Sequence, residues 1–210
     1  MANLISSPED FGTGWVQTNS SAGVNTIVAL DGTTTGDKLI DDGATGSNVV
    51  QFGQVVSGVP TSSSIVVSVF AKADQLDWAY FEIDSYSTPP SNTRAWFDLT
   101  NGAVGSNPSA GIDTTGIDDY GDGWYRCWAT FTTAADSTGV VRIGVTDADD
   151  GLNVDRDNTS SMFVWGAHMD VAPLTNYVAQ SGAIISLGSR GFVHALTQPL
   201  VRSIVSNLTR

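Results

Sequence analysis

Few residues of this chain have the types and spacing that catalysis requires. The sequence contains two histidines, His168 and His194, and no Gly-x-Ser-x-Gly elbow of the kind that presents a serine nucleophile. His168 falls in an expected strand, so we predict a structural or surface role for it. Phosphate-binding glycine loops and zinc-ligand spacings are also absent. Paired carboxylates of the glycosidase type arise by chance in an acidic chain, and we therefore expect a protein that is not an enzyme.

Clustered aspartates form the candidate metal site. Asp147, Asp149 and Asp150 follow an expected strand, and Asp155 and Asp157 come soon after. Hard cations such as calcium take several oxygen ligands from loops of this kind. The spacing does not follow the twelve-residue calcium loop, so the alternative is a set of solvated acidic turns that keep the protein soluble. No other cofactor is expected.

Aromatic and charged side chains provide the main candidate for binding. Expected strands over residues 77–84, 93–99 and 124–132 alternate in character, and successive side chains of a strand point to opposite faces. One side of each strand is apolar, and we expect it to be buried. The other side combines rings with hydrogen-bonding groups, and its members are Trp78, Tyr80, Glu82, Arg94, Trp96, Asp98, Arg126 and Trp128.

Such a face has the chemistry of a sugar-binding platform. Sugar C–H faces stack on aromatic planes, while sugar hydroxyls need polar partners. The glycan-binding candidates are therefore Trp78, Tyr80, Arg94, Trp96, Arg126 and Trp128. The alternative is that a loop, a neighbouring subunit or the end of the chain covers these rings, because apolar patches mark interfaces of any kind.

Short strands joined by turns must position these side chains. Glycine, serine, threonine and asparagine separate brief stretches rich in valine, isoleucine and aromatic residues, which is typical of strands. Eight strands are expected, over residues 24–30, 48–56, 64–72, 77–84, 93–99, 124–132, 139–146 and 162–171. Eight strands favour an all-β fold, a two-sheet antiparallel jelly-roll sandwich formed by residues 1–180 as one domain. Residues 105–122 are expected to form a long surface loop.

Residues 181–210 differ in charge from the rest of the chain. They contain three arginines and no acidic residue, whereas the rest holds all 22 acidic residues and six of the nine basic ones. Their apolar positions fit a short amphipathic helix after Pro199 or an extended arm, and either form needs a partner. We predict a short C-terminal anchoring arm whose contacts come from Phe192, Leu196, Leu200, Val201, Arg202, Ile204 and Val205.

Composition restricts the partners. A formal net charge of −13 disfavours binding to a nucleic-acid backbone or to an anionic membrane surface. No apolar run approaches the roughly 20 residues that span a bilayer, and the start lacks the features of a signal peptide, so we expect no membrane insertion. The single cysteine, Cys127, excludes an internal disulfide. Proteins, neutral glycans and cations remain as partners.

Four motifs occur in an order that resembles a known family. They are Ser-Val-Phe-Ala-Lys at 68–72, Phe-Asp-Leu-Thr-Asn-Gly at 97–102, Gly-Trp-Tyr-Arg-Cys at 123–127 and Trp-Gly-Ala-His-Met-Asp at 165–170, the last followed by Asn176-Tyr177-Val178. They resemble the jelly-roll module of many bacteriophage structural proteins, which is similar to non-catalytic carbohydrate-binding modules. The resemblance covers about residues 3–180. The family usually has glutamine, leucine and glutamate at the positions of His168, Met169 and Asp170.

The resemblance implies a place on a phage particle rather than a reaction. We expect a non-enzymatic virion structural protein, made in the host cytoplasm, whose arm attaches it to other virion proteins of the capsid or tail. It could also form a homo-oligomer. The lack of a long shaft or coiled-coil segment favours a capsid decoration or head appendage over a tail fibre. The alternative is a host-glycan-binding tail-fibre module that uses the aromatic face.

Overall fold

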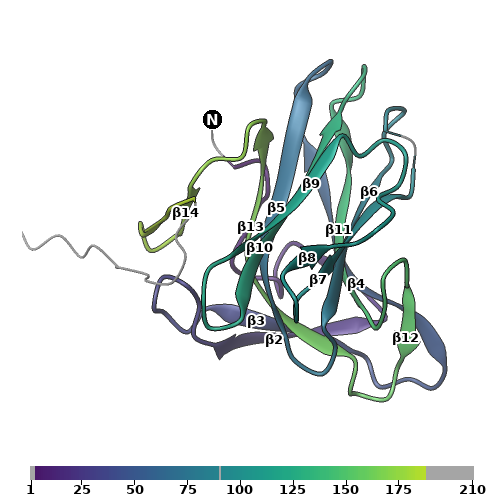
Figure 1. Cartoon of the computed structure of the whole chain (residues 1–210), viewed down its shortest axis with the longest axis vertical. Coiled ribbons are helices and arrows are strands. Elements are labelled where there is room, and N and C mark those ends of the chain that lie inside the picture. The colour runs from purple at the N-terminus through teal and green to yellow at the C-terminus, as the bar shows by residue number, and fades with distance from the viewer. Residues whose placement is uncertain (1–2, 90, 188–210) are drawn as a thin grey trace, which may run out of the picture.

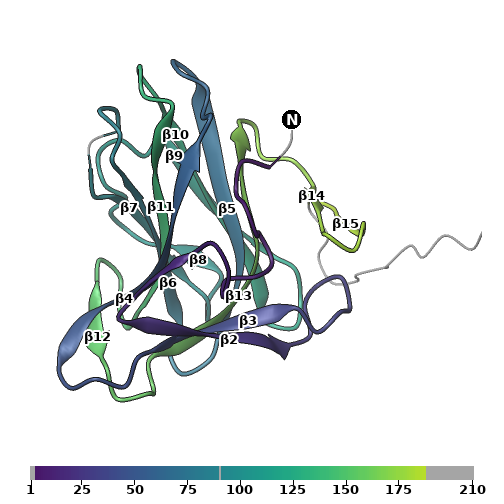
Figure 2. The same ribbon diagram turned by 180° about the vertical axis from the view of Figure 1, so that it is seen from behind.

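Two antiparallel sheets make up the computed structural model, which describes residues 3–89 and 91–187 (Figures 1 and 2). The first sheet has the order β1 (Val16–Thr18), β4 (Ser47–Ser57), β11 (Thr138–Thr146), β6 (Trp78–Asp84), β7 (Thr93–Asp98) and β8 (Ala103–Val104), with β12 (Asn153–Asp155) beside β4. The second has the order β2 (Ser20–Ile27), β3 (Gly36–Asp41), β13 (Ser161–Val171), β5 (Ser64–Ala73), β10 (Trp124–Thr132) and β9 (Thr114–Asp119). A small ribbon pairs β14 (Tyr177–Val178) with β15 (Ile184–Ile185).

The order of the strands defines the topology. The centre of the first sheet is β4-β11-β6-β7, and the centre of the second is β3-β13-β5-β10. Eight strands divided in this way form two Greek keys that share a core. The fold is a jelly roll. The described part of the chain contains no helix, and the prediction of an all-β, two-sheet antiparallel sandwich is confirmed.

Seven of the eight expected strands begin and end within one residue of an observed strand. The first expected strand, over residues 24–30, is displaced, because β2 ends at Ile27 and its register is irregular around Asn25, whose φ is +54°. β3 and β9 were not expected as strands. β9 lies inside the predicted loop 105–122 and is an edge strand in which half of the residues, Gly116, Asp118 and Asp119, have a low propensity for strands.

The core lies between the two sheets. Inward-facing side chains of both sheets are almost fully buried, as predicted from the alternation for Phe81, Phe97 and Phe131. Cys127, on the same side of β10 as Phe131, is buried and free. Burial of such side chains stabilises a fold by about 1.5–3 kcal/mol each.

A second apolar cluster lies on the outer face of the second sheet. Phe70, Trp124 and Trp165 point away from the core and pack against Tyr177 and Ile185 of the β14–β15 ribbon. Figures 1 and 2 show this ribbon beside β13 and β5, on the side of the molecule away from β4 and β11. The C-terminal segment 172–187 therefore covers part of the outer face, and we call it the C-terminal strap.

The strap includes the predicted domain boundary at residue 180. Beyond that boundary Ile185 is only 3% exposed, so the chain remains packed on the body as far as Ile185. The other residues of the predicted arm lie outside the described part of the chain, and they include every proposed anchoring residue: Phe192, Leu196, Leu200, Val201, Arg202, Ile204 and Val205. Among the described residues, no helix has the length and apolar character to span a bilayer.

Gly144 provides a test of the packing on the first sheet. A Cβ atom at this position would lie 2.2 Å from Cζ of Tyr80, which is paired with Gly144 across β11 and β6. We expect Gly144→Ala to lower the free energy of unfolding by about 2 kcal/mol, because the ring has to move. Urea denaturation measures this cost. In a Tyr80→Ala background the same substitution should cost less than about 0.5 kcal/mol, and an equal cost in both backgrounds would contradict the contact.

Candidate functional site

The six glycan-binding candidates do not share one face of the molecule. Four of them extend from β6 and β7 on the outer face of the first sheet: Trp78, Tyr80, Arg94 and Trp96. Arg126 and Trp128 extend from β10 on the outer face of the second sheet. The prediction of a single platform is wrong, because alternation tells which side of a strand a residue takes but not which sheet the strand joins.

Two of the rings on the first sheet are covered. Tyr80 lies over Gly144 and donates a hydrogen bond from Oη to Oε1 of Gln51 at 2.9 Å. Trp96 donates from Nε1 to the carbonyl oxygen of Gly151 at 2.8 Å, and both rings are buried. The alternative prediction, that a loop covers such rings, is confirmed for Trp96.

Charged side chains beside these rings form a network among themselves. Glu82 accepts hydrogen bonds from Arg94 at 2.6 Å and from Arg142 at 2.5 Å. Arg142 also donates to Asp84 at 2.7 Å. Two acidic and two basic side chains thereby neutralise each other, and Arg94 has its Nε and one terminal nitrogen directed at Glu82. The charged residues of this part of the predicted site therefore connect β6, β7 and β11 to one another.

The aspartates of the candidate calcium site hold a loop. Asp149 Oδ2 accepts hydrogen bonds from the backbone N–H of Ser106 at 2.8 Å and from its hydroxyl at 2.6 Å. Asp150 accepts one from Nδ2 of Asn107 at 2.9 Å, and Asp147 is exposed. Within residues 3–89 and 91–187 no group of three or more acidic, histidine or cysteine side chains is arranged to hold a metal ion. Calcium binding by these residues stays a prediction.

Arg126 is buried beneath the C-terminal strap. Its Nη1 donates to the carbonyl oxygen of Thr175 at 2.6 Å, and its Nε and Nη2 donate to Oγ of Ser68 at 3.2 and 3.1 Å. The guanidinium also lies 5.3 Å from the centroid of the Phe70 ring. Burial lowers the pKa of Arg126, although an arginine remains charged in proteins. Arg126 therefore holds the strap and is not free to bind a sugar.

Two buried or half-buried carboxylates fix the rest of the strap. Glu9 accepts hydrogen bonds from Oη of Tyr177 and from the backbone N–H of Gln180, both at 2.8 Å. Asp31 accepts one from the hydroxyl of Ser181 at 2.7 Å. Burial raises the pKa of the Glu9 carboxyl above its ordinary value. The strap is therefore held by a carboxyl group that is largely shielded from water.

His168 lies on the same outer face, beside the strap. Its ring centroid is 6.3 Å from that of Tyr177, and its Nδ1 has no hydrogen-bond partner in the described structure. Burial lowers the pKa of His168 to about 4, and the positive charge of Arg126 acts in the same direction. The prediction of a structural role agrees with this position, whereas His194 lies outside the described residues.

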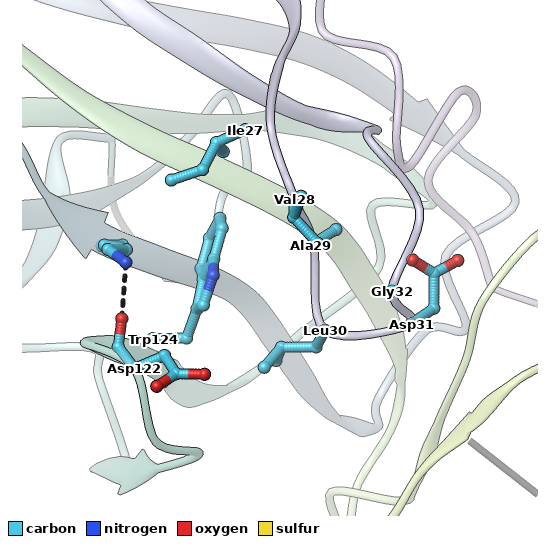
Figure 3. A pocket seen from close by; sticks show the side chains of 9 residues that line it. Ile27, Val28, Ala29, Leu30, Asp31, Gly32, Asp122 and Trp124 are labelled. Atoms are coloured by element: carbon cyan, nitrogen blue, oxygen red, sulfur yellow. Dashed lines mark hydrogen bonds between the residues drawn. The ribbon is translucent and has the colours of Figure 1, made fainter. Parts of the chain in front are cut away.

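A pocket of about 430 Å³ lies at one end of this face, and Figure 3 shows the side chains that line it. Ile27 and Leu30 point toward the indole of Trp124, and Nζ of Lys72 donates to the carbonyl oxygen of Asp122 at 2.5 Å. Trp124 is only 3% exposed. A ring this covered offers no plane on which a ligand could stack, so the pocket is mainly a gap under the loop 28–32.

A larger groove of about 620 Å³ lies at the other end of the same face. One side consists of β9 and β10 and carries Asp118, Trp128 and Thr130. The other side is the strap, with Pro173, Leu174 and Leu187. Volumes of 300–1,000 Å³ are typical of ligand sites. Of the six predicted glycan-binding residues, Trp128 lines this groove. Its side chain is half-buried there.

Sequence reasoning missed the residues that hold the strap. Glu9 and Asp31 accept hydrogen bonds from the strap, and Ser68 accepts hydrogen bonds from the Arg126 guanidinium that donates to the strap. The signal that could have revealed the site was the set of motifs itself, because three of them lie on β5, β10 and β13, which are neighbours in the second sheet. Their outward residues converge on the same apolar cluster.

Comparison with known proteins gives weak similarities in structure. No family model and no curated protein matches the chain. Among solved structures it is similar to the enzymatically active domain of tailspike protein 4 of bacteriophage CBA120, at 10% identity and a TM-score of 0.47 over 81% of this chain and 21% of that one. It is also similar to TmCBM61 in complex with β-1,4-galactotriose (9% identity, TM-score 0.47, 82% and 100% covered) and to a CBM4 structure (18%, 0.40, 75% and 86%). The chain spans about a fifth of the tailspike chain.

His168 predicts a pH dependence of stability. Its pKa in the fold, about 4, lies below its ordinary value of 6.5, so folding favours the neutral ring. The contribution is complete above pH 6.5 and is lost as the pH falls toward 4. At pH 5 the protein should have lost about 2 kcal/mol relative to pH 8 through this group.

Replacement of His168 by glutamine isolates this effect, because glutamine does not titrate. Urea denaturation at pH 8 and pH 5 gives the free energy of unfolding of both proteins, and other acids contribute equally to each. The His168→Gln variant should lose about 2 kcal/mol less than the wild type over this interval. Equal losses would show that His168 is solvated or already charged in the fold.

Proposed function

We propose that the chain is a non-enzymatic structural module of a bacteriophage particle, a capsid decoration or a head or tail appendage attached through residues 188–210. The observation that carries this proposal is the C-terminal strap. Its hydrogen bonds to Arg126 and Glu9 fix Thr175 and Gln180 on the outer face of the second sheet, and the backbone N–H of Leu187 donates to Oδ1 of Asn176 within the strap. The residues after Leu187 therefore follow a segment that has a defined position on the jelly roll.

The motifs that resemble the phage module support this assignment. They contribute Phe70, Trp124, Arg126 and Trp165 to the outer face, and Tyr177 from the strap completes the cluster. Ring pairs such as Phe70 with Trp165, at 5.5 Å, and Trp165 with Tyr177, at 5.2 Å, bind the strap to the sheet. The motifs that resemble the phage module thus supply the residues that hold the C-terminal strap, and this role is structural and not catalytic.

The charge distribution supports attachment by the same end. Residues after Leu187 include Arg190, Arg202 and Arg210 and no acid, while the body is strongly acidic. Such an arm suits an acidic, apolar groove on another virion protein, and the acidic body discourages binding to packaged nucleic acid. A jelly roll alone does not determine function, so the assignment depends on the arm.

Substitutions in the arm of the full-length chain test this proposal. Leu200→Asp combined with Ile204→Asp should remove the protein from particles, because charged groups replace the apolar contacts that attach it. Quantitative mass spectrometry of purified particles measures the copy number. The matched control is Val55→Asp, at a valine that is 62% exposed on the body, and it should leave the copy number unchanged.

An unchanged copy number in the arm variant would overturn attachment through residues 188–210. Loss of the protein from particles in the Val55→Asp control as well would contradict attachment through the arm alone.

A further inference from the structure

The groove beside Trp128 contains an aromatic plane of fixed orientation. Trp128 is paired with Gly116 across β10 and β9, and a Cβ atom on Gly116 would lie 2.2 Å from Cζ2 of the indole. The ring therefore covers the glycine and lies against β9. Its Nε1 donates a hydrogen bond to Oδ2 of Asp118 at 3.1 Å, which holds the ring in this position. An aromatic plane held this way loses little conformational entropy when a ligand stacks on it.

Hydrogen-bonding oxygens surround this plane on β9 and β10. Asp118 lies on one side of Trp128, and the hydroxyls of Thr114 and Thr130 lie on the other and bond each other at 2.6 Å. The carboxylate of Asp113 accepts a bond from Thr132 at 2.8 Å at the same end of the groove. These groups are exposed or half-buried, so they can exchange bonds with water for bonds with a ligand.

The charge of the groove selects among ligands. Two carboxylates and no lysine, arginine or histidine line it within the described structure. Carboxylates accept hydrogen bonds from hydroxyl groups, and they repel phosphates, sulfates and carboxylated sugars. The opposite wall, formed by Pro173, Leu174 and Leu187 of the strap, is apolar and supplies contact surface without further charge.

We propose that the groove binds a neutral glycan, with one sugar ring stacked on Trp128 and hydroxyl groups of successive sugar units donating hydrogen bonds to Asp118 and Asp113. The combination of one ring face, two carboxylates and a volume of about 620 Å³ suits a short uncharged oligosaccharide. This inference goes beyond the attachment function and does not depend on it, because the anchoring residues lie elsewhere in the chain.

Binding of the full-length chain to a neutral glycan array, followed by calorimetry, tests the proposal. The calorimetric probes are β-1,4-galactotriose, cellotriose, maltotriose and the acidic trisaccharide trigalacturonic acid, together with any array hit. We expect saturable binding of at least one neutral glycan and at least tenfold weaker binding of trigalacturonic acid. Trp128→Ala should weaken the neutral ligand tenfold or more. The matched control is Phe163→Ala, at a half-buried aromatic residue of β13 that does not line the groove, and it should leave the affinity unchanged.

Further variants separate recognition from folding. Trp128→Phe keeps an aromatic plane and should retain part of the affinity if Trp128→Ala does not fold. Asp113→Asn with Asp118→Asn keeps the shape of the groove, so it should weaken the neutral glycan several-fold and reduce the discrimination against trigalacturonic acid. A role of these acids in folding alone would not change that discrimination.

Several results would overturn the proposal. They are no binding of any neutral glycan, full affinity in the folded Trp128 variants, and equal binding of neutral and acidic probes. Sugar binding that appears only after Arg190→Ala and Phe192→Ala substitutions would also overturn it, by showing that the chain's own end occupies the groove. Failure of glycan binding would leave the copy number in particles unaffected, so it is distinguishable from failure of the attachment function.

Discussion

The guanidinium of Arg126, buried on the outer face of the second sheet, is the interaction on which the arrangement of surfaces depends. A jelly roll needs only its inner faces to form a core, so an outer face normally carries solvated side chains. Here β5, β10 and β13 place Phe70, Arg126 and Trp165 outward in one row. An arginine without solvent must have its N–H groups satisfied, and the carbonyl oxygen of Thr175 provides one acceptor. The second sheet thus needs the strap, because the strap supplies a hydrogen-bond acceptor for the buried guanidinium of Arg126.

This constraint determines which surfaces remain available. The strap closes the face over Arg126 and leaves the groove at Trp128 open at its edge. On the first sheet, the pairing of Glu82 with Arg94 and Arg142 and the loops over Trp96 use the groups that the sequence offered for binding. The proposed sugar recognition therefore falls at the rim between the strap and β9, and the proposed attachment falls to the chain that follows the strap.

The sequence contained enough information for the fold but not for the site. Strong alternation in β6, β7 and β10 made their positions and inner faces predictable, because the apolar side chains on one side of each strand are buried in the core. β9 was missed because an edge strand needs only one neighbour, β10, and can include several residues with low strand propensity, here Gly116, Asp118 and Asp119. The prediction of one aromatic platform was wrong for a different reason. Only the pairing of strands shows that Trp96 and Trp128 lie on opposite sheets.

The aspartates show the same limit. Asp41 is buried and accepts hydrogen bonds from the backbone N–H groups of Gly43, Asn158 and Ser160 at 2.8–2.9 Å. Asp149 likewise accepts a hydrogen bond from the backbone N–H of Ser106. An acidic composition alone predicted solubility or a cation, whereas the structure uses many of these carboxylates to satisfy N–H groups of loops. Such pairings join residues that are far apart in the sequence, so spacing along the chain cannot reveal them.

Hydrogen exchange of the strap measured by mass spectrometry in an Arg126→Met variant tests the central claim most directly. The account predicts that amides of residues 172–187 exchange at least tenfold faster than in the wild type, while the core strands β5 and β10 keep their protection. An Arg142→Met variant, which loses an arginine from the outer face of the first sheet, should leave the strap unchanged. Unaltered protection of residues 172–187 without Arg126 would contradict the account.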